Sequence, residues 1–313
     1  MRASKFALVF LLAGSVHAWN AAGHRTIAYI AYRNLKQGTR ERVDLLLQSH
    51  PDYARWVEGV PVERRPLEAF LHASVWADEI KGDPRYKNEP RDAAPEEPPS
   101  YPDMFRHQNW HYVDEPLSGD FAAVKIDDGL NRDWRKPPTV LSQIPAMKST
   151  LADKRTSDAA KAWALAWLIH LTGDVHQPLH CVSRYSLDTA TGKMADDAGG
   201  NRVRLLGPAH NLHAYWDDLM EEDASVAAVK ELGDGLMATN VPAKGKTNEK
   251  DWQAEGAGLA VDFVYPGLAG AKMENGSLAV PRQYRVVATA VAGHRIAAAG
   301  YRLAQTLNKL ASK

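Results

Sequence analysis

Residues 158–180 read DAAKAWALAWLIHLTGDVHQPLH, and this stretch decides the fold class. A helical apolar pattern starts at Asp158, and Trp163 and Trp167, about one turn apart, are predicted to anchor the helix in a core. Pro178 ends the helix, because proline lacks the N–H that an interior helical position donates. The stretch therefore predicts a core helix whose last turn carries histidine and aspartate.

Most of the remaining sequence also shows helical spacing. Strand-like runs are few, the best being 110–113 and 201–206, and the proline-rich stretch Asp83–Pro102 is predicted to be a surface loop bordering the functional cleft. We therefore expect an all-α fold, a single mainly helical domain with a short β ribbon. Further helical patterns start near His24, Thr39, Pro66, Thr139, Ala209 and Asp251, and the tail Pro281–Leu310 carries an apolar stripe of Val287, Ala290, Val291, His294, Ala297, Ala298 and Tyr301.

The composition excludes several classes of protein. With 45% hydrophobic and 24% charged residues among 313, the chain is predicted to be globular and neither disordered nor a polytopic membrane protein. Lys+Arg and Asp+Glu balance at 38 each, which argues against a broad basic surface for nucleic acid or anionic lipid. Any bound phosphate must therefore meet positive charge of another origin. The single cysteine, Cys181, excludes an intrachain disulfide framework and a cysteine-based zinc finger.

Residues 1–18 have the features of a signal peptide. A short basic start precedes an apolar run and small residues at the expected cleavage point, whereas the alternative is a buried N-terminal helix. Cleavage would leave a mature domain, 19–313, in a secreted or periplasmic protein. It would also free the α-amine of Trp19, which can bind a metal ion once deprotonated.

Two histidine–aspartate pairs carry the first chemical signal. His170 and Asp174 are four residues apart and share a helical face, and Pro178 leaves His180 free to turn back towards them. His213 and Asp217 repeat that spacing in NLHAYWDDL. Imidazole and carboxylate ligands favour zinc in a chain without thiol pairs. Each pair taken alone is more typical of a contact on a helix surface.

Seven motifs, taken in order, show a wider resemblance. The chain resembles the trinuclear-zinc, single-strand-specific nucleases of the S-one/P-one type, typified by secreted fungal enzymes and including plant and bacterial members. The likeness covers essentially the whole mature chain and implies the mainly helical phospholipase C/nuclease-like fold; the lack of disulfides points to a bacterial member. The motifs are WNAAGHR (19–25), WAD (76–78), NWHYVD (109–114), HLTGDVHQPLH (170–180), GGN (199–201), NLHAYWD (211–217) and AGYRLAQTLN (299–308).

The resemblance implies a cofactor of three Zn²⁺ ions, with Asp78 and Asp174 as catalytic carboxylates. Three divalent ions and three ligand aspartates leave a net charge of about +3, which would supply the positive charge that the surface lacks. The ions would polarise water for attack on a phosphodiester. The implied ligands are Asp78, His111, His170 and Asp174 for one zinc, the Trp19 amine and carbonyl with His24 and shared Asp174 for a second, and His180, His213 and Asp217 for the third.

The resemblance also implies the reaction and the substrate contacts. The activity would be endonucleolytic hydrolysis of single-stranded DNA and RNA to 5′-phosphate products, with 3′-nucleotidase activity on nucleotides. A base stacked on Tyr112 and hydrogen-bonded to Asp114 must be unpaired, which favours single strands. Lys81 and Asn201 match other substrate-contacting positions.

Two other functions remain open at this point. A zinc-dependent phospholipase C, acting on phospholipids, shares the three-zinc cage, and the base site of Tyr112 and Asp114 is what favours a nuclease. A non-catalytic zinc scaffold would saturate its metal ions with protein ligands. His180, His213 and Asp217 are only three ligands, which leaves room for water or substrate and favours catalysis.

Overall fold

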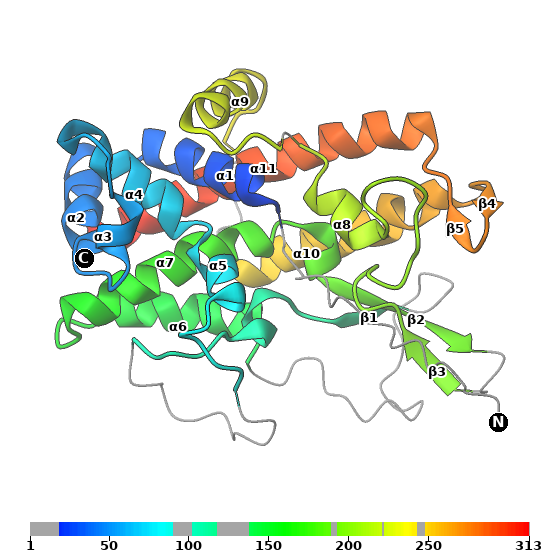
Figure 1. Ribbon diagram of the computed structural model, residues 1–313, viewed down its shortest axis with the longest axis horizontal. Helices are drawn as coiled ribbons and strands as arrows, with labels where there is room; N and C mark the ends of the chain where they lie inside the picture. The colour runs from blue at the N-terminus through cyan, green and yellow to red at the C-terminus, as the bar shows by residue number, and fades with distance from the viewer. Residues whose placement is uncertain are drawn as a thin grey trace, which may run out of the picture.

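Helix α7, Asp158–Asp174, forms the centre of the protein in the computed structural model (Figure 1). The structure describes residues 19–89, 102–117, 138–188, 193–220, 222–242 and 248–312. The Ser157 side chain caps the helix by accepting a hydrogen bond from the N–H of Ala160. Every residue from Ala162 to Asp174 is buried, so α7 is covered on all sides.

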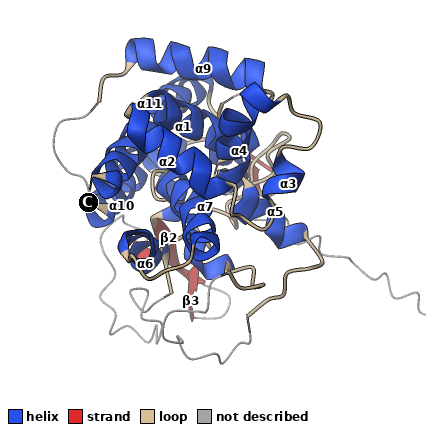
Figure 2. Ribbon diagram, turned by 90° about the vertical axis from the view of Figure 1, so that its left-hand side faces the viewer, coloured by secondary structure: helices blue, strands red, loops and turns tan. Residues whose placement is uncertain are grey.

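Other helices cover α7 in every direction. The long helix α11 lies beside α1, and α9 packs on the outer side of both (Figure 2). The helices in contact with α7 are α1 (Ala21–Arg33), α2 (Gln37–Leu47), α4 (Arg65–Ala73), α5 (Trp76–Gly82), α6 (Val140–Ala152) and α11 (Arg282–Ala311). The remaining ones are α3 (Tyr53–Trp56), α8 (Leu212–Asp217), α9 (Val226–Thr239) and α10 (Glu249–Leu259). The expected mainly helical fold is confirmed.

The β structure is short and differs in place from the prediction. Strand β1 (Glu115–Leu117) pairs in parallel with β2 (Val182–Asp188), which pairs antiparallel with β3 (Lys193–Asp196). A second ribbon joins β4 (Met273–Glu274) to β5 (Ser277–Leu278). The two predicted strands are wrong: 110–113 begins in a 3₁₀ turn, η2 (Gln108–His111), and 201–206 is a turn with isolated bridges.

The buried face of α11 also differs from the predicted stripe. His294 and Ala290 are exposed, whereas Ala288, Ala292 and Ile296 are fully buried. Alanine occurs all round this helix, so hydrophobicity alone does not single out one face.

Two predicted segments fall largely outside the described residues. These are residues 1–18 and most of the proline-rich stretch 83–102. Among the described residues, no helix combines the length and apolar character needed to cross a bilayer.

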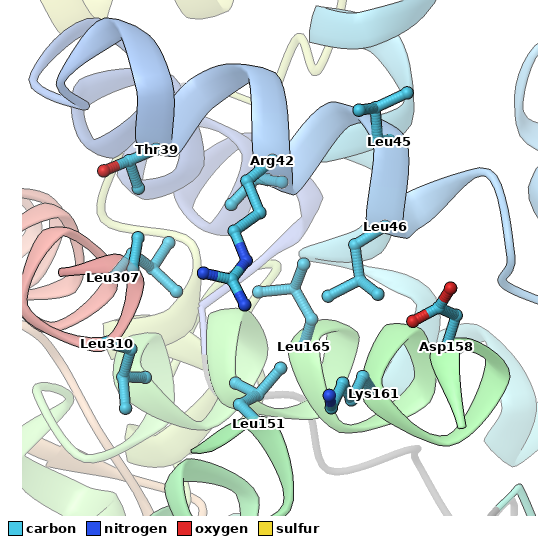
Figure 3. A pocket seen from close by; sticks show the side chains of 12 residues that line it. Thr39, Arg42, Leu45, Leu46, Leu151, Asp158, Lys161, Leu165, Leu307 and Leu310 are labelled. Carbon is cyan, nitrogen blue, oxygen red and sulfur yellow. The ribbon is translucent and has the colours of Figure 1, made fainter. Parts of the chain in front are cut away.

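A cavity of about 220 Å³ lies against the N-terminal half of α7, where Asp158, Lys161 and Leu165 line it (Figure 3). Leu46, Leu151 and Leu165 face it, and the side chain of Arg42 extends into it. None of the predicted site residues lines this cavity.

Candidate metal centre

The last turn of α7 provides the centre of the candidate site. His170 and Asp174 are both fully buried, and the His170 Nε2 atom lies 3.2 Å from Asp174 Oδ2. The chain leaves the helix after Asp174 and enters a second 3₁₀ turn, η3 (Pro178–His180). As the proline predicts, His180 is thereby turned back into the protein interior, where it is fully buried.

A first group forms where α5 and η2 meet this turn. His111 Nδ1 lies 3.0 Å from both Asp174 Oδ2 and His170 Nε2. Asp78 Oδ1 lies 3.7 Å from His170 Nε2 and 3.8 Å from His111 Nδ1. Ligands about 2 Å from one tetrahedral ion lie about 3.3 Å from each other, so these separations suit a shared metal ion.

A second group forms around His24 of α1. Its Nε2 atom lies 3.3 Å from Asp174 Oδ1 and 3.9 Å from Asp78 Oδ2. The two oxygens of Asp174 therefore face different groups, Oδ2 the first and Oδ1 the second. Trp19 is fully buried beside them and donates its Nε1–H to the carbonyl of Gly173 at 3.1 Å. A Cβ atom on Gly173 would lie 2.8 Å from His24 Nδ1, so glycine is required for this close approach.

The third group combines η3 with α8. His180 Nε2 lies 3.0 Å from His213 Nε2. The same His213 atom lies 3.7 Å from Asp217 Oδ2. All three side chains are buried. His213 and Asp217 share one face of α8, as their spacing predicts.

Backbone carbonyls fix the tautomers of three histidines. The Nδ1 atoms of His170, His180 and His213 lie 2.7, 2.8 and 2.7 Å from the carbonyl oxygens of Ser74, His111 and Gly199. A carbonyl can only accept, so each Nδ1 carries the proton and each Nε2 presents its lone pair to the cluster. This is the usual support of a metal-binding histidine.

Most imidazoles of the cluster are held in the neutral form that binds metal ions. Burial lowers the pKa of His24, and the neighbouring His170 adds to this effect. Burial also lowers the pKa of His111 to about 3, and lowers the pKa of His180. For His170, burial is outweighed by the charges of nearby carboxylates, chiefly Asp174, and its pKa is raised. A bound metal ion would favour the neutral form of His170.

The carboxylates differ in how their charge is compensated. Burial opposes ionisation of Asp174, but His170 and other neighbours outweigh it and hold its pKa well below the usual range. Burial also opposes ionisation of Asp78, but the charge of Lys81 outweighs this effect and lowers the pKa of Asp78. Burial raises the pKa of Asp217 well above the usual range. No lysine or arginine of the described residues forms an ion pair with Asp217, and a divalent ion would supply the missing positive charge.

The donor atoms fit metal ions. Within the described ranges, three groups of histidine and aspartate each place their ligand atoms within 4.8 Å of one another. In the part of the chain that the structure describes, both ring nitrogens of His24 and the Oδ1 atom of Asp174 are buried without a hydrogen-bond partner. Buried polar atoms of this kind are rare in proteins, and an ion held between them would satisfy them. The three-residue sets that meet this distance are His24, Asp78 and His170, from the first and second groups; His111, His170 and Asp174, from the first; and His180, His213 and Asp217, which are the third.

The predicted substrate-contacting residues lie next to these groups in the chain or in space. Lys81 Nζ lies 2.6 Å from Asp78 Oδ1, one turn along α5. Tyr112 and Asp114 follow His111 and are partly exposed, and the Tyr112 hydroxyl donates to Asn109. The partly exposed Asn201 donates to the carbonyl of Ala198, in the turn whose Gly199 carbonyl holds His213.

Several supporting residues carry no sequence signal of their own. Gln177 bonds to Asp217, and Glu255 of α10 joins two buried arginines of α11, Arg295 and Arg302. These arginines bind the backbone oxygen and the Nε2 atom of His176, just after α7. The sequence hints at such a supporting role only in that these polar residues occur in segments otherwise predicted to be core.

His107 ties together the chain in front of η2. Its backbone is left-handed, with φ of 45°, and its ring stacks on Trp110 at 3.6 Å. Its Nδ1 atom lies 2.8 Å from Glu89, and its Nε2 atom lies 2.9 Å from Asp103. Burial lowers the pKa of His107, but the two carboxylates outweigh burial and raise it.

This contact predicts a pH-dependent contribution to stability. The folded pKa of His107 is above the unfolded value of about 6.5, so its contribution is complete below that pH and is lost as pH rises through the folded pKa. The variant His107→Gln should therefore lose more unfolding free energy at a pH of about 5.5 than at about 8.5. Denaturant titrations of both proteins at the two pH values would measure this; an equal loss at both would contradict the assignment.

Comparisons with known proteins match this chain over nearly its whole length. A family model described as S1/P1 nuclease matches residues 19–312. Nuclease P1 from Penicillium citrinum is 25% identical over 93% of this chain and 97% of its own length. Nuclease S1 from Aspergillus oryzae is 23% identical over 98% and 96%, and Endonuclease 2 from Arabidopsis thaliana 24% over 95% and 92%. The match includes every residue of the three groups.

Proposed function

The chain belongs to the S1/P1 nuclease family, and from that premise we propose a zinc-dependent endonuclease that cleaves single-stranded DNA and RNA. As a family member the protein is a nuclease, a hydrolase of phosphodiester bonds. The finer proposal adds 5′-phosphate products and 3′-nucleotidase activity. The observation that carries it is the convergence of three histidine–aspartate groups around Asp174 and η3.

Three zinc ions are proposed as the cofactor. Bound zinc would lower the pKa of a water molecule and offset the charge of the phosphate. The first group would hold one ion, with Asp78 and Asp174 among its ligands. A second ion would be held by His24 and, after cleavage, by the amine and carbonyl of Trp19, and it would share Asp174 with the first ion. The third group would hold the third ion.

The substrate would approach from the side where the cluster reaches solvent. Asp78 and Asp217 are 8% and 6% exposed, whereas Asp174 is fully buried. A phosphodiester would therefore meet the edge formed by Asp78 and Asp217, with Lys81 beside it. A base stacked on Tyr112 would gain about 1–3 kcal/mol, and only an unpaired base can stack there.

We also propose where the protein acts, and we do not propose the phospholipase C alternative. A secreted or periplasmic protein is supported by the signal-peptide pattern of residues 1–18 and by the family match, which begins at Trp19. Phospholipase C activity is not proposed, because the matching family and the relatives named above are nucleases.

Metal removal tests the proposed function directly. We expect the mature chain to contain close to three zinc ions, to lose hydrolysis of single-stranded DNA and RNA on chelation, and to regain it with zinc. Elemental analysis and an assay of the same sample would measure this, with duplex DNA as the control substrate. Hydrolysis that is indifferent to chelation, or equal on duplex DNA, would contradict the proposal.

A further inference from the structure

Gln177 joins the two elements that build the third group. Its side chain is fully buried between η3 and α8. Its Nε2–H donates to Asp217 Oδ1 at 2.8 Å, and its Oε1 accepts from the backbone N–H of Leu179. Because a backbone N–H can only donate, the Leu179 contact fixes which end of the amide faces Asp217.

The first consequence concerns His180. Gln177 caps η3 through its side chain, and its carbonyl accepts from the N–H of His180 at 3.1 Å. The turn that carries His180 to within 3.0 Å of His213 is therefore held at its start by Gln177.

The second consequence concerns Asp217. Gln177 occupies the Oδ1 atom and leaves Oδ2, which lies 3.7 Å from His213 Nε2, to face the group. Among the described residues Asp217 forms no ion pair with lysine or arginine. The amide of Gln177 is therefore the main group that orients this buried carboxylate.

We propose that Gln177 is a positioning residue for the third metal centre, which sets its metal affinity by orienting Asp217 and the His180 turn together. Gln177 touches neither the substrate nor the metal ion. The inference rests on the metal assignment in the proposed function. Removal of a group that orients a metal ligand typically weakens metal binding about 10–100-fold.

A matched pair of variants tests this role. Gln177→Met keeps the length of the side chain and removes both hydrogen bonds. Gln253→Met is the control, because Gln253 is also buried and donates to the carbonyl of Cys181 and to Glu115, none of which is a candidate ligand. We expect Gln177→Met to release one zinc equivalent at a chelator concentration about 10–100-fold lower than the wild type, with Gln253→Met unchanged.

A second background separates positioning from general damage. In an Asp217→Ala chain, Gln177→Met should change the zinc content and the chelator profile no further, because Asp217→Ala alone already removes the zinc ion that both contacts of Gln177 support. If Gln177→Met does not fold, Gln177→Glu keeps the acceptor for Leu179 but not the donor, and should show the same loss.

The outcomes distinguish this inference from the proposed function. A folded Gln177→Met with wild-type zinc content and chelator profile would overturn the positioning role alone. Further zinc loss on adding Gln177→Met to Asp217→Ala would also overturn it, since Gln177 would then act elsewhere. A wild-type chain that binds no zinc would overturn the proposed function itself.

Discussion

Replacement of Asp174 by alanine is expected to lower kcat/KM on single-stranded DNA by at least roughly 10³-fold, more than any other single aspartate replacement. Its two oxygens face different groups, Oδ2 towards His111 at 3.0 Å and Oδ1 towards His24 at 3.3 Å. The oxygens of Asp78 face the same two histidines at the longer distances of 3.8 and 3.9 Å. Loss of the Asp174 carboxylate would therefore weaken two metal centres at once. Metal ions contribute several kcal/mol to such reactions, and about 1.4 kcal/mol corresponds to a tenfold change in rate.

The comparison with Asp217→Ala makes this prediction specific. Within the described part of the chain Asp217 faces the third group through His213, so its loss should remove close to one zinc equivalent. Asp174 faces His111 through one oxygen and His24 through the other, so Asp174→Ala should reduce the occupancy of two ions. Zinc content and kcat/KM of both variants would be measured on the same preparations. Equal losses in the two variants would argue against a bridging role of Asp174.

Local spacing predicts the parts of the site that lie on single helices. Residues four apart share a helical face, and the structure confirms this for His170 with Asp174 and for His213 with Asp217. The arrival of His24 and His111 at the same place depends on packing between elements far apart in the chain. The motif resemblance indicated that convergence, and spacing alone could not.

The sequence does not predict the roles of residues that support the site without being able to bind a metal ion. Gly173 lies in a buried helix at a cost of about 1 kcal/mol relative to alanine, and the close approach of His24, with Ile27 also nearby, explains it. Gln177 is one polar residue among many until Asp217 is placed beside it. The strand predicted at 110–113 failed for a similar reason, because the left-handed turn at His107 is stabilised by Glu89 and Asp103.

Addition of one glycine before Trp19 is expected to lower activity by roughly 10–100-fold and to remove one zinc equivalent. The extension converts the α-amine into an amide, whose nitrogen lone pair is delocalised into the carbonyl and does not bind zinc. Trp19 stays anchored, because its ring is fully buried and its Nε1–H bonds to Gly173. The thermal unfolding midpoint without metal should therefore change little.

The contacts of Asn20 explain why the amine has no freedom to move elsewhere. Its N–H donates to the carbonyl of Asp217 at 3.1 Å, and its side chain caps α1 by accepting from Gly23 at 2.9 Å. Because the Trp19 ring and the Asn20 backbone are both held in place, the position of the Trp19 amine is fixed. An added residue can only extend from that position. A glycine added after Lys313 is the matched control and should leave zinc content and rate unchanged. Full activity of the N-terminally extended chain would show that the Trp19 amine is not a ligand, since the folded backbone gives it no second route to the cluster.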